Sequence, residues 1–182
     1  MRDTPIRGSY WVVEGVLLAG EYPGSSIRDE AAEKLGRLLD AGITRFVDLT
    51  EKNELRPYEP HVAELAAARN VAVSCDRFAI RNRDVPSEDD MSRILATIKR
   101  AIDDGSAVYV HCWGGIGRTG TVVGCWLVQE QGLTGDEALA RIAELRCRTS
   151  NRDCASPETD AQCEFIRQWA ARHLPGLKAR PT

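Results

Sequence analysis

The chain has 182 residues, which is enough for one folded domain with a hydrophobic core and too few for two domains of ordinary size. Charged residues make up 28% of it and the net charge is −3, so no basic excess indicates binding to nucleic acid or to an anionic membrane surface. No apolar run is long enough to span a membrane, and residues 1–5 do not begin a signal peptide. We therefore expect one domain over residues 1–182, cytoplasmic and monomeric, with a frayed segment at 174–182.

The six cysteines and three histidines do not form the patterns of a metal site, because no Cys-x2-Cys pair and no histidine cluster occurs. The chain is also larger than a disulfide scaffold, so free thiols are favoured, with Cys125 in the core. We expect chemistry without a metal or a cofactor. If Cys112 has a redox partner, Cys75 at the end of an expected strand is the strongest candidate.

Strand patterns precede residue 111. Two β-prone runs split by Glu14-Gly15 predict a hairpin at one edge of a sheet. The expected strands are 10–13, 16–19, 43–49, 71–80 and 107–110.

Helical patterns alternate with these strands and then continue alone to the C-terminal end. The signals are apolar residues at helical spacing, capping residues at the starts and glycines at the stops. The expected helices run from a Ser26/Asp29 capping box to Gly42, over 60–69, from the cap Ser87 to Gly105, and over 118–131, 135–146 (opened by a Thr134/Glu137 capping box) and 157–173. This order predicts an α/β fold: a central, mostly parallel sheet flanked by helices on both faces, with a C-terminal helical cluster.

Residues 111–120, His-Cys-Trp-Gly-Gly-Ile-Gly-Arg-Thr-Gly, form a loop between an expected strand and the start of an apolar helix. A helix N-terminus binds anions, and the three glycines at 114, 115 and 117 allow successive amide N–H groups to point inward as a cradle. We therefore expect residues 113–118, which include Trp113 and Ile116, to bind phosphate at the carboxyl end of a central strand.

The residues around the cradle supply reactive groups. Cys112 lies where the amides, the helix dipole and Arg118 favour the thiolate, which is a ready nucleophile. Arg118 can grip two phosphate oxygens and stabilise the charge of a transition state. We expect the hydroxyl of Thr119 to donate to the sulfur, and His111 to orient the loop through its ring N–H.

The run matches His-Cys-x5-Arg-Thr/Ser, so the chain resembles the cysteine-dependent protein tyrosine phosphatase superfamily, especially its dual-specificity and kinase-associated-phosphatase-like members. The resemblance implies a phosphatase-type fold and hydrolysis of phosphomonoesters through a phosphocysteine. Because residues 113–117 contain no lysine, we favour a phosphoprotein substrate, with phosphotyrosine ahead of phosphoserine and phosphothreonine.

The proton donor for the leaving group is displaced from the usual position of the family. Related acid loops place an aspartate four residues before the proline of Val-Pro-Ser, where this chain has Asn82. Asp84 is favoured instead; its alternative is a solvated carboxylate paired with Arg81 or Arg83. The donor could also be absent or lie elsewhere. Asp76 is a weaker candidate, and the acidic residues 88–90 are explained by the helix start.

The segment Pro157–Gln162 is similar to the Gln-Thr-x-x-Gln motif with which classical tyrosine phosphatases position the hydrolytic water, except that Glu158 replaces the first glutamine. Two interpretations stay open for each residue. Glu158 could contact the site or face solvent at a helix start, and Gln162 could position water or form ordinary helix hydrogen bonds.

Three other functions remain in competition. Loss of aspartate at position 82 is compatible with a phosphate-binding pseudophosphatase. An inositol phosphate or phosphoinositide substrate is less favoured because residues 113–117 contain no lysine, although Arg81 and Arg83 could supply charge. A thiol oxidoreductase would need a resolving cysteine close to Cys112, and none is evident in the sequence.

Overall fold

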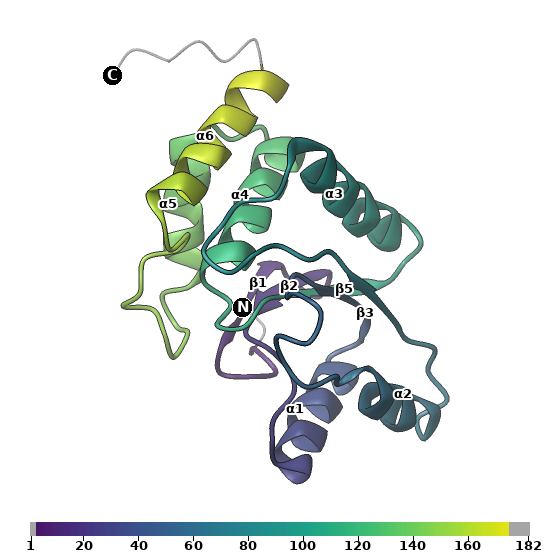
Figure 1. Ribbon diagram of the computed structural model, residues 1–182. Helices are drawn as coiled ribbons and strands as arrows, with labels where there is room; N and C mark the ends of the chain where they lie inside the picture. Colours follow the sequence, from purple (N-terminus) through teal and green to yellow (C-terminus); the bar gives the residue numbers. More distant parts are fainter. Residues whose placement is uncertain (1–2, 175–182) are drawn as a thin grey trace.

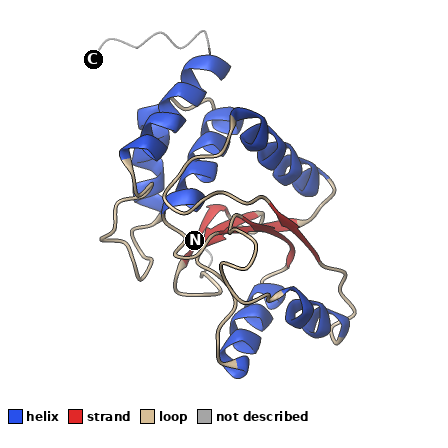
Figure 2. Cartoon of the chain, viewed as in Figure 1, coloured by secondary structure: helices blue, strands red, loops and turns tan. Residues whose placement is uncertain are grey.

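The computed structural model describes residues 3–174, in which five strands form a single sheet with the order β1-β2-β5-β3-β4 (Figure 2). Strand β1 runs antiparallel to β2, and the other three pairs of neighbours are parallel. The predicted mostly parallel sheet is confirmed. The strands are β1 (Ser9–Val13), β2 (Leu17–Gly20), β3 (Ile43–Asp48), β4 (Ser74–Arg77) and β5 (Ala107–His111).

Within residues 3–174, six helices cover the two faces of the sheet, with α1 and α2 on one face and α3 to α6 on the other (Figure 1). The buried side chains divide in the same way into one apolar cluster on each face. Alternating positions of the buried strands point to opposite faces, so both clusters draw on the same strands. The helices are α1 (Arg28–Asp40), α2 (Glu59–Ala67), α3 (Glu88–Asp103), α4 (Gly117–Gln131), α5 (Gly135–Leu145) and α6 (Asp160–His173).

Local signals place several element ends correctly. The hairpin turns at Gly15, whose φ of +75° suits glycine, and Ser87 caps α3 by accepting the Asp90 N–H. The Thr134/Glu137 capping box is present at the start of α5. These three predictions are confirmed.

Other predicted ends are wrong. Helix α1 begins at Arg28 with Ile27 as a cap that makes no side-chain hydrogen bond, because Ser25 rather than Ser26 bonds the backbone there. Helix α6 begins at Asp160 and not at 157, since Thr159 and Gln162 form its capping box. Strand β4 is shorter than 71–80, because residues 45–48 of β3 alone lie opposite it.

Helix α4 is the buried centre of the larger helical layer. All of its residues from 117 to 128 are buried, as expected for a helix that is apolar on nearly every side. Within residues 3–174, no helix is both long and apolar enough to cross a bilayer. Apart from Leu174, the predicted frayed segment 174–182 lies outside the described residues.

Candidate active site

The candidate phosphate-binding loop follows β5, the central strand of the sheet, and leads into α4. Its position at the carboxyl end of a central parallel strand is the one expected for a ligand site in an open α/β sheet. Cys112 is the first residue after the strand and is 3% exposed. Trp113, in contrast, is 60% exposed and lies at the rim of the loop.

The outward side of the loop is fixed by two segments that are distant in sequence. Its carbonyl groups accept hydrogen bonds from the segment that follows β2 and from the segment between α5 and α6. The pairs are Tyr22 N–H to Trp113 O (2.8 Å), Asn151 Nδ2 to Gly114 O (2.9 Å) and Ser156 Oγ to Ile116 O (2.8 Å).

The amide groups of the loop form its inward side. Among residues 3–174 no acceptor takes the N–H groups of residues 113–116. Gly115 has a φ of +67°, and a Cβ there would collide with the backbone of Gly20 and Glu21. Carbonyls held outward and amides left free are the arrangement of an anion-binding nest.

Arg118 is almost completely buried and is held by the carboxylate of Glu54. Its Nη1 and Nη2 lie 2.7 and 2.6 Å from the two oxygens of Glu54, which is a two-point contact between planar groups. Nη1 also donates to the carbonyl of Ile80 at 3.0 Å. The hydrogen bond from Arg118 lowers the pKa of Glu54, so the carboxylate is ionised at neutral pH and the guanidinium is oriented before any ligand arrives.

His111 is a neutral imidazole that contacts the backbone of the loop at Cys112. Burial lowers its pKa, although nearby Asp48 opposes this effect. Nδ1 lies 3.2 Å from the Cys112 carbonyl and Nε2 lies 2.7 Å from the Tyr58 hydroxyl. Because a carbonyl can only accept, Nδ1 carries the hydrogen and Nε2 accepts from Tyr58.

Thr119 is buried, and its hydroxyl has no hydrogen-bond partner among the described residues. A buried hydroxyl without a partner is costly unless it serves a ligand or a reacting group. Its expected donation to the Cys112 sulfur stays a prediction.

The acid loop, residues 81–86, lies next to the start of α6. Gln162 Nε2 donates to the carbonyl of Asp84 at 3.0 Å, and Arg83 pairs with Glu158 at 3.3 Å. Asp84 is exposed, and its carboxylate accepts the N–H of Val85. No ion pair joins Asp84 to an arginine within the described part of the chain, so the solvated pair that competed with the catalytic interpretation is not formed.

Glu158 and Gln162 both border the candidate phosphate-binding loop. A Cβ added to Gly117 would lie within about 3.0 Å of each of their side chains. The Gln162 amide is fully buried, and its oxygen accepts the N–H groups of Glu158 and Thr159. Gln162 thus connects three segments: the loop, the start of α6 and the backbone of Asp84.

Other predicted candidates lie outside this arrangement. Asp76, on β4, pairs with Arg45 at 2.6 Å. All six cysteines are free thiols, and burial raises the pKa of Cys75 to about 11, a setting that disfavours thiolate exchange with Cys112. Within residues 3–174, no group of three or more His, Cys, Asp or Glu side chains is placed to hold a metal ion.

Sequence reasoning missed several residues that hold the site together. Glu54 and Tyr58 come from the segment between β3 and α2, to which the sequence assigns at most the entrance of the site and no contact with Arg118 or His111. Asn151 and Ser156 come from a similar segment before α6. No spacing rule connects these positions to Cys112, because their contacts join parts of the chain that meet only when the sheet and helices pack.

Comparisons with known proteins find relatives that match part of the chain. The uncharacterized protein MJECL20 of Methanocaldococcus jannaschii is 35% identical over 96 residues, 52% of this chain and 58% of that protein. The phosphatidylglycerophosphate phosphatase PTPMT1 of Arabidopsis thaliana is 30% identical over 115 residues, 62% of this chain and 32% of that protein. This chain therefore spans less than two thirds of the length of either relative.

Solved structures give the same fold. A kinase associated phosphatase (KAP) with its catalytic cysteine changed to serine superimposes with a TM-score of 0.72, at 17% identity, over 95% of this chain and 98% of that one. The family described as Swiss Army Knife protein, DSP-PTPase phosphatase domain, matches residues 6–173. The chain therefore belongs to the DSP-PTPase phosphatase domains, within the cysteine-dependent protein tyrosine phosphatase superfamily that its loop resembles.

Proposed function

We propose that this chain is a dual-specificity-type phosphatase that hydrolyses phosphomonoesters on proteins through a phosphocysteine at Cys112. The observation that carries the proposal is the loop itself. Its carbonyls are held outward, its amides are free, and Arg118 is oriented beside the buried Cys112 by Glu54. These groups supply a nucleophile and positive charge where a phosphate would lie, without a metal or a cofactor.

In the first step, the thiolate of Cys112 attacks phosphorus. The sulfur–phosphorus bond forms as the bond from phosphorus to the substrate oxygen breaks. Arg118 and the amides of residues 113–118 bind the other phosphate oxygens and stabilise their charge. The carboxyl group of Asp84 gives its proton to the departing oxygen.

In the second step, water attacks the phosphocysteine and Asp84 takes its proton. The sulfur–phosphorus bond breaks, its electron pair returns to Cys112, and inorganic phosphate leaves. The free hydroxyl of Thr119 donates to the departing sulfur, which makes the thiolate a better leaving group. His111 and Tyr58 hold the backbone of Cys112 through both steps.

The substrate is a phosphoprotein, with phosphotyrosine ahead of phosphoserine and phosphothreonine. Trp113 at the rim supports an aromatic substrate, because it can pack against a phenyl ring. Relatives named as tyrosine-protein phosphatases point in the same direction. Inositol phosphates and phospholipids are the competing class, since one relative is named a phosphatidylglycerophosphate phosphatase and one similar structure holds PI(5)P.

A pseudophosphatase, which binds phosphate without turnover, is the second candidate because Asn82 replaces the usual acid. The presence of Cys112, Arg118 and Thr119 argues for turnover. The monomeric state, the cytoplasmic location and the single domain over 1–182 rest on composition and length and stay predictions.

Hydrolysis of an aryl phosphate tests the proposal, since its good leaving group needs little help from an acid. We expect turnover by the wild-type protein. In Cys112→Ser, kcat/KM should fall at least about a thousandfold, the size of loss that removal of a catalytic nucleophile causes. Cys147→Ser, at an exposed cysteine, is the matched control and should retain full activity. Equal activity in Cys112→Ser would contradict the mechanism, and binding of aryl phosphate without turnover would favour the pseudophosphatase.

A further inference from the structure

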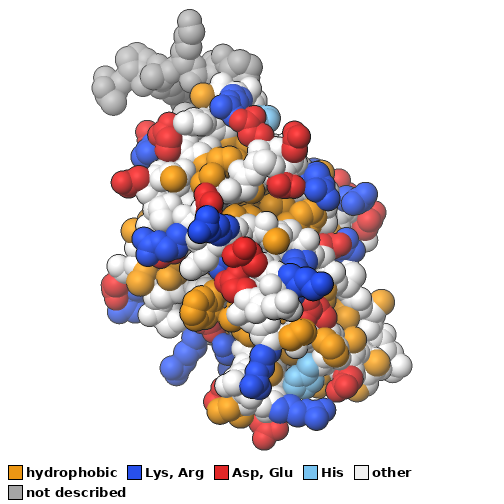
Figure 3. Space-filling view, in the orientation of Figure 1, with side chains coloured by type: hydrophobic (Ala, Val, Ile, Leu, Met, Phe, Trp, Pro, Cys, Tyr) orange, Lys and Arg blue, Asp and Glu red, His pale blue; other side chains and the backbone are white. Residues whose placement is uncertain are grey.

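Arg146, directly after α5, is a buried cation without an acidic partner. Its side chain is 2% exposed, and within residues 3–174 no carboxylate lies at ion-pair distance from it. The Lys and Arg side chains on the surface, in contrast, are interspersed with Asp and Glu (Figure 3). A buried guanidinium destabilises the fold unless its donors find acceptors.

The donors of Arg146 bind the segment between α5 and α6. Nη1 donates to the carbonyl of Cys154 at 2.8 Å, and Nη2 donates to the carbonyl of Asn151 at 3.0 Å. Nη2 also lies 3.0 Å from the side-chain oxygen of Asn151, and the hydroxyl of Thr149 lies 2.9 Å from the same oxygen. Because a guanidinium can only donate, this atom of the amide is the oxygen, and the side-chain nitrogen faces the other way.

The side-chain nitrogen of Asn151 faces the candidate phosphate-binding loop. Nδ2 donates to the Gly114 carbonyl at 2.9 Å. In a trans peptide, the C=O of one residue and the N–H of the next point in opposite directions. The contact that holds the Gly114 carbonyl outward therefore aims the N–H of Gly115 inward, where no acceptor takes it among residues 3–174. The direction of one amide of the nest thus depends on one side chain.

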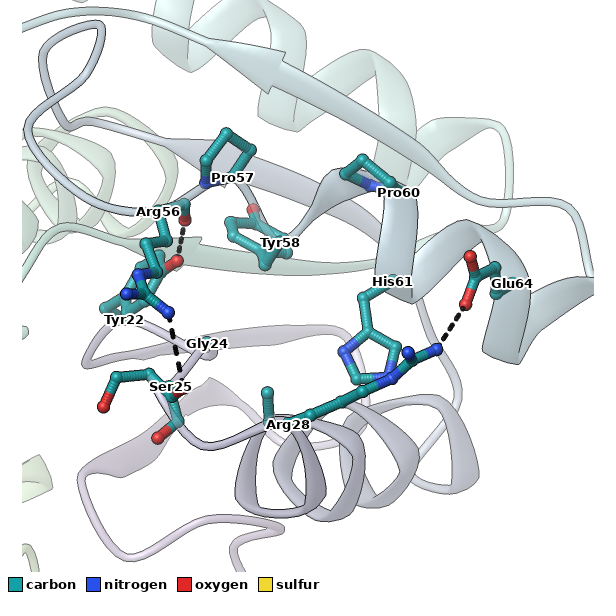
Figure 4. Close-up of a pocket in the computed structure, with 12 residues that line it drawn as sticks. Tyr22, Gly24, Ser25, Arg28, Arg56, Pro57, Tyr58, Pro60, His61 and Glu64 are labelled. Atoms are coloured by element: carbon teal, nitrogen blue, oxygen red, sulfur yellow. Dashed lines mark hydrogen bonds and ion pairs between the residues drawn. The ribbon is translucent and has the colours of Figure 1, made fainter.

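The preceding peptide group of the loop is held by a different segment. The backbone N–H of Tyr22 holds the Trp113 carbonyl, and the Tyr22 hydroxyl donates to the carbonyl of Arg56 (Figure 4). In the described part of the chain, only Asn151 donates to the Gly114 carbonyl. Neither Gly114 nor Gly115 has a Cβ atom that would restrict rotation of the peptide between them, so a tertiary contact is needed to fix it.

We propose that Arg146 and Asn151 are positioning residues, which together aim the N–H of Gly115 at an oxygen of the bound phosphate. The inference rests on the proposed function and deepens it. Arg146 acts through Asn151, and Asn151 acts through the peptide between Gly114 and Gly115. The result is one further donor that is oriented for the phosphate charge before the substrate arrives.

Asn151→Asp tests the proposal and leaves the contacts of Arg146 in place. The aspartate keeps an oxygen for Arg146 and gives that buried cation a carboxylate, but it has no N–H for Gly114. We therefore expect the midpoint of chemical unfolding to stay the same or to rise. In the same variant, kcat/KM for an aryl phosphate should fall about tenfold, and the Kd for inorganic phosphate, measured by calorimetry, should rise about tenfold. A role confined to stability cannot produce a loss of affinity without a loss of stability.

Asn151→Leu separates the loss of the donor from the added negative charge. Leucine is neutral and similar in size, and it also lacks the N–H, so kcat/KM and phosphate affinity should again fall about tenfold. Full activity and affinity in Asn151→Leu would overturn the positioning role, because the loss in Asn151→Asp would then come from charge repulsion. Asn70→Asp, at an exposed asparagine after α2, is the matched control and should change none of these quantities.

A double-mutant cycle tests whether Arg146 acts through Asn151. Arg146→Lys keeps the charge but lacks the planar fork that binds both backbone and side-chain oxygens, so kcat/KM should fall by up to about tenfold. The double variant Arg146→Lys/Asn151→Leu should lose no more than Asn151→Leu alone. Additive losses would overturn the action of Arg146 through Asn151.

Failure of the proposed function would give a different result. Neither the wild-type protein nor any variant would then hydrolyse the aryl phosphate in a Cys112-dependent way, yet both Asn151 variants would still bind inorganic phosphate more weakly than the wild type. Equal phosphate affinity in the wild type and both Asn151 variants would overturn the positioning role, even where hydrolysis depends on Cys112.

Discussion

Arg118 is the residue on which the chemistry of the site depends most after Cys112. A guanidinium that must bind two phosphate oxygens is useful only if its plane is fixed before the substrate arrives. Glu54 and the carbonyl of Ile80 provide that constraint, with contacts of 2.6–3.0 Å to a side chain that is 2% exposed. We interpret Glu54 as a positioning residue that acts through Arg118.

Glu54→Gln tests this interpretation. The amide offers one acceptor where the carboxylate offered two, so we expect a loss of about 1–3 kcal/mol in the free energy of unfolding. We also expect kcat/KM for an aryl phosphate to fall by about 10- to 100-fold, because Arg118 is no longer held in one plane. Glu51→Gln is the control, since Glu51 is an exposed carboxylate in the same segment.

The pH dependence of stability gives a second test of the pair formed by Glu54 and Arg118. Arg118 lowers the pKa of Glu54 in the folded protein, so the stabilisation from this pair is fully present above the ordinary pKa of about 4.5. It is lost as the pH falls from there through the lowered pKa. Chemical unfolding between neutral and acidic pH should therefore show a smaller acid loss in Glu54→Gln than in wild type. An unchanged pH profile would mean that the pair does not stabilise the fold.

For turns and helix starts, signals confined to a few neighbouring residues were sufficient to predict where the element begins or ends. The hairpin turn at Gly15, the Ser87 cap and the Thr134/Glu137 box all follow from local sequence. The end of β4 does not, because it depends on which residues of β3 lie opposite. The start of α6 is set by the Thr159/Gln162 capping box, a local signal that the expected start at 157 did not use. The acid loop is harder still, since its path is fixed by Arg83–Glu158 and Gln162.

The connection between α6 and the acid loop predicts a role for Gln162 different from that of a water-positioning residue. Its amide nitrogen donates to the Asp84 backbone, so removal of that contact should impair delivery of the proton. We expect Gln162→Leu to resemble Asp84→Asn: a small loss on aryl phosphates with good leaving groups and a loss of about 100-fold on poor ones.

Gln168→Leu, at an exposed position on α6, is the matched control and should leave both substrates unaffected. A uniform loss on all leaving groups, with accumulation of phosphoenzyme, would instead assign Gln162 to the water step. The comparison of leaving groups therefore separates the two interpretations that the sequence leaves open.

For the whole molecule, the central strand β5 determines where the site lies, and the surrounding segments determine what it can do. The alternation of strands and helices and the His-Cys-x5-Arg-Thr run were enough to predict the sheet, the buried α4 and the loop. The sequence could not show that residues 22, 54, 58, 151 and 156 converge on that loop and its arginine and histidine. These contacts depend on tertiary packing, which no local pattern encodes.

Detection of a phosphoryl group on Cys112 during turnover tests the central claim most directly. The wild-type protein would be mixed with an aryl phosphate, quenched within milliseconds, digested and analysed by mass spectrometry. We predict transient gain of one phosphoryl group on the peptide that contains Cys112, coincident with a burst of released phenol, and no gain in Cys112→Ala. Turnover that persists in Cys112→Ala, or a phosphoryl group on any other residue, would contradict the account.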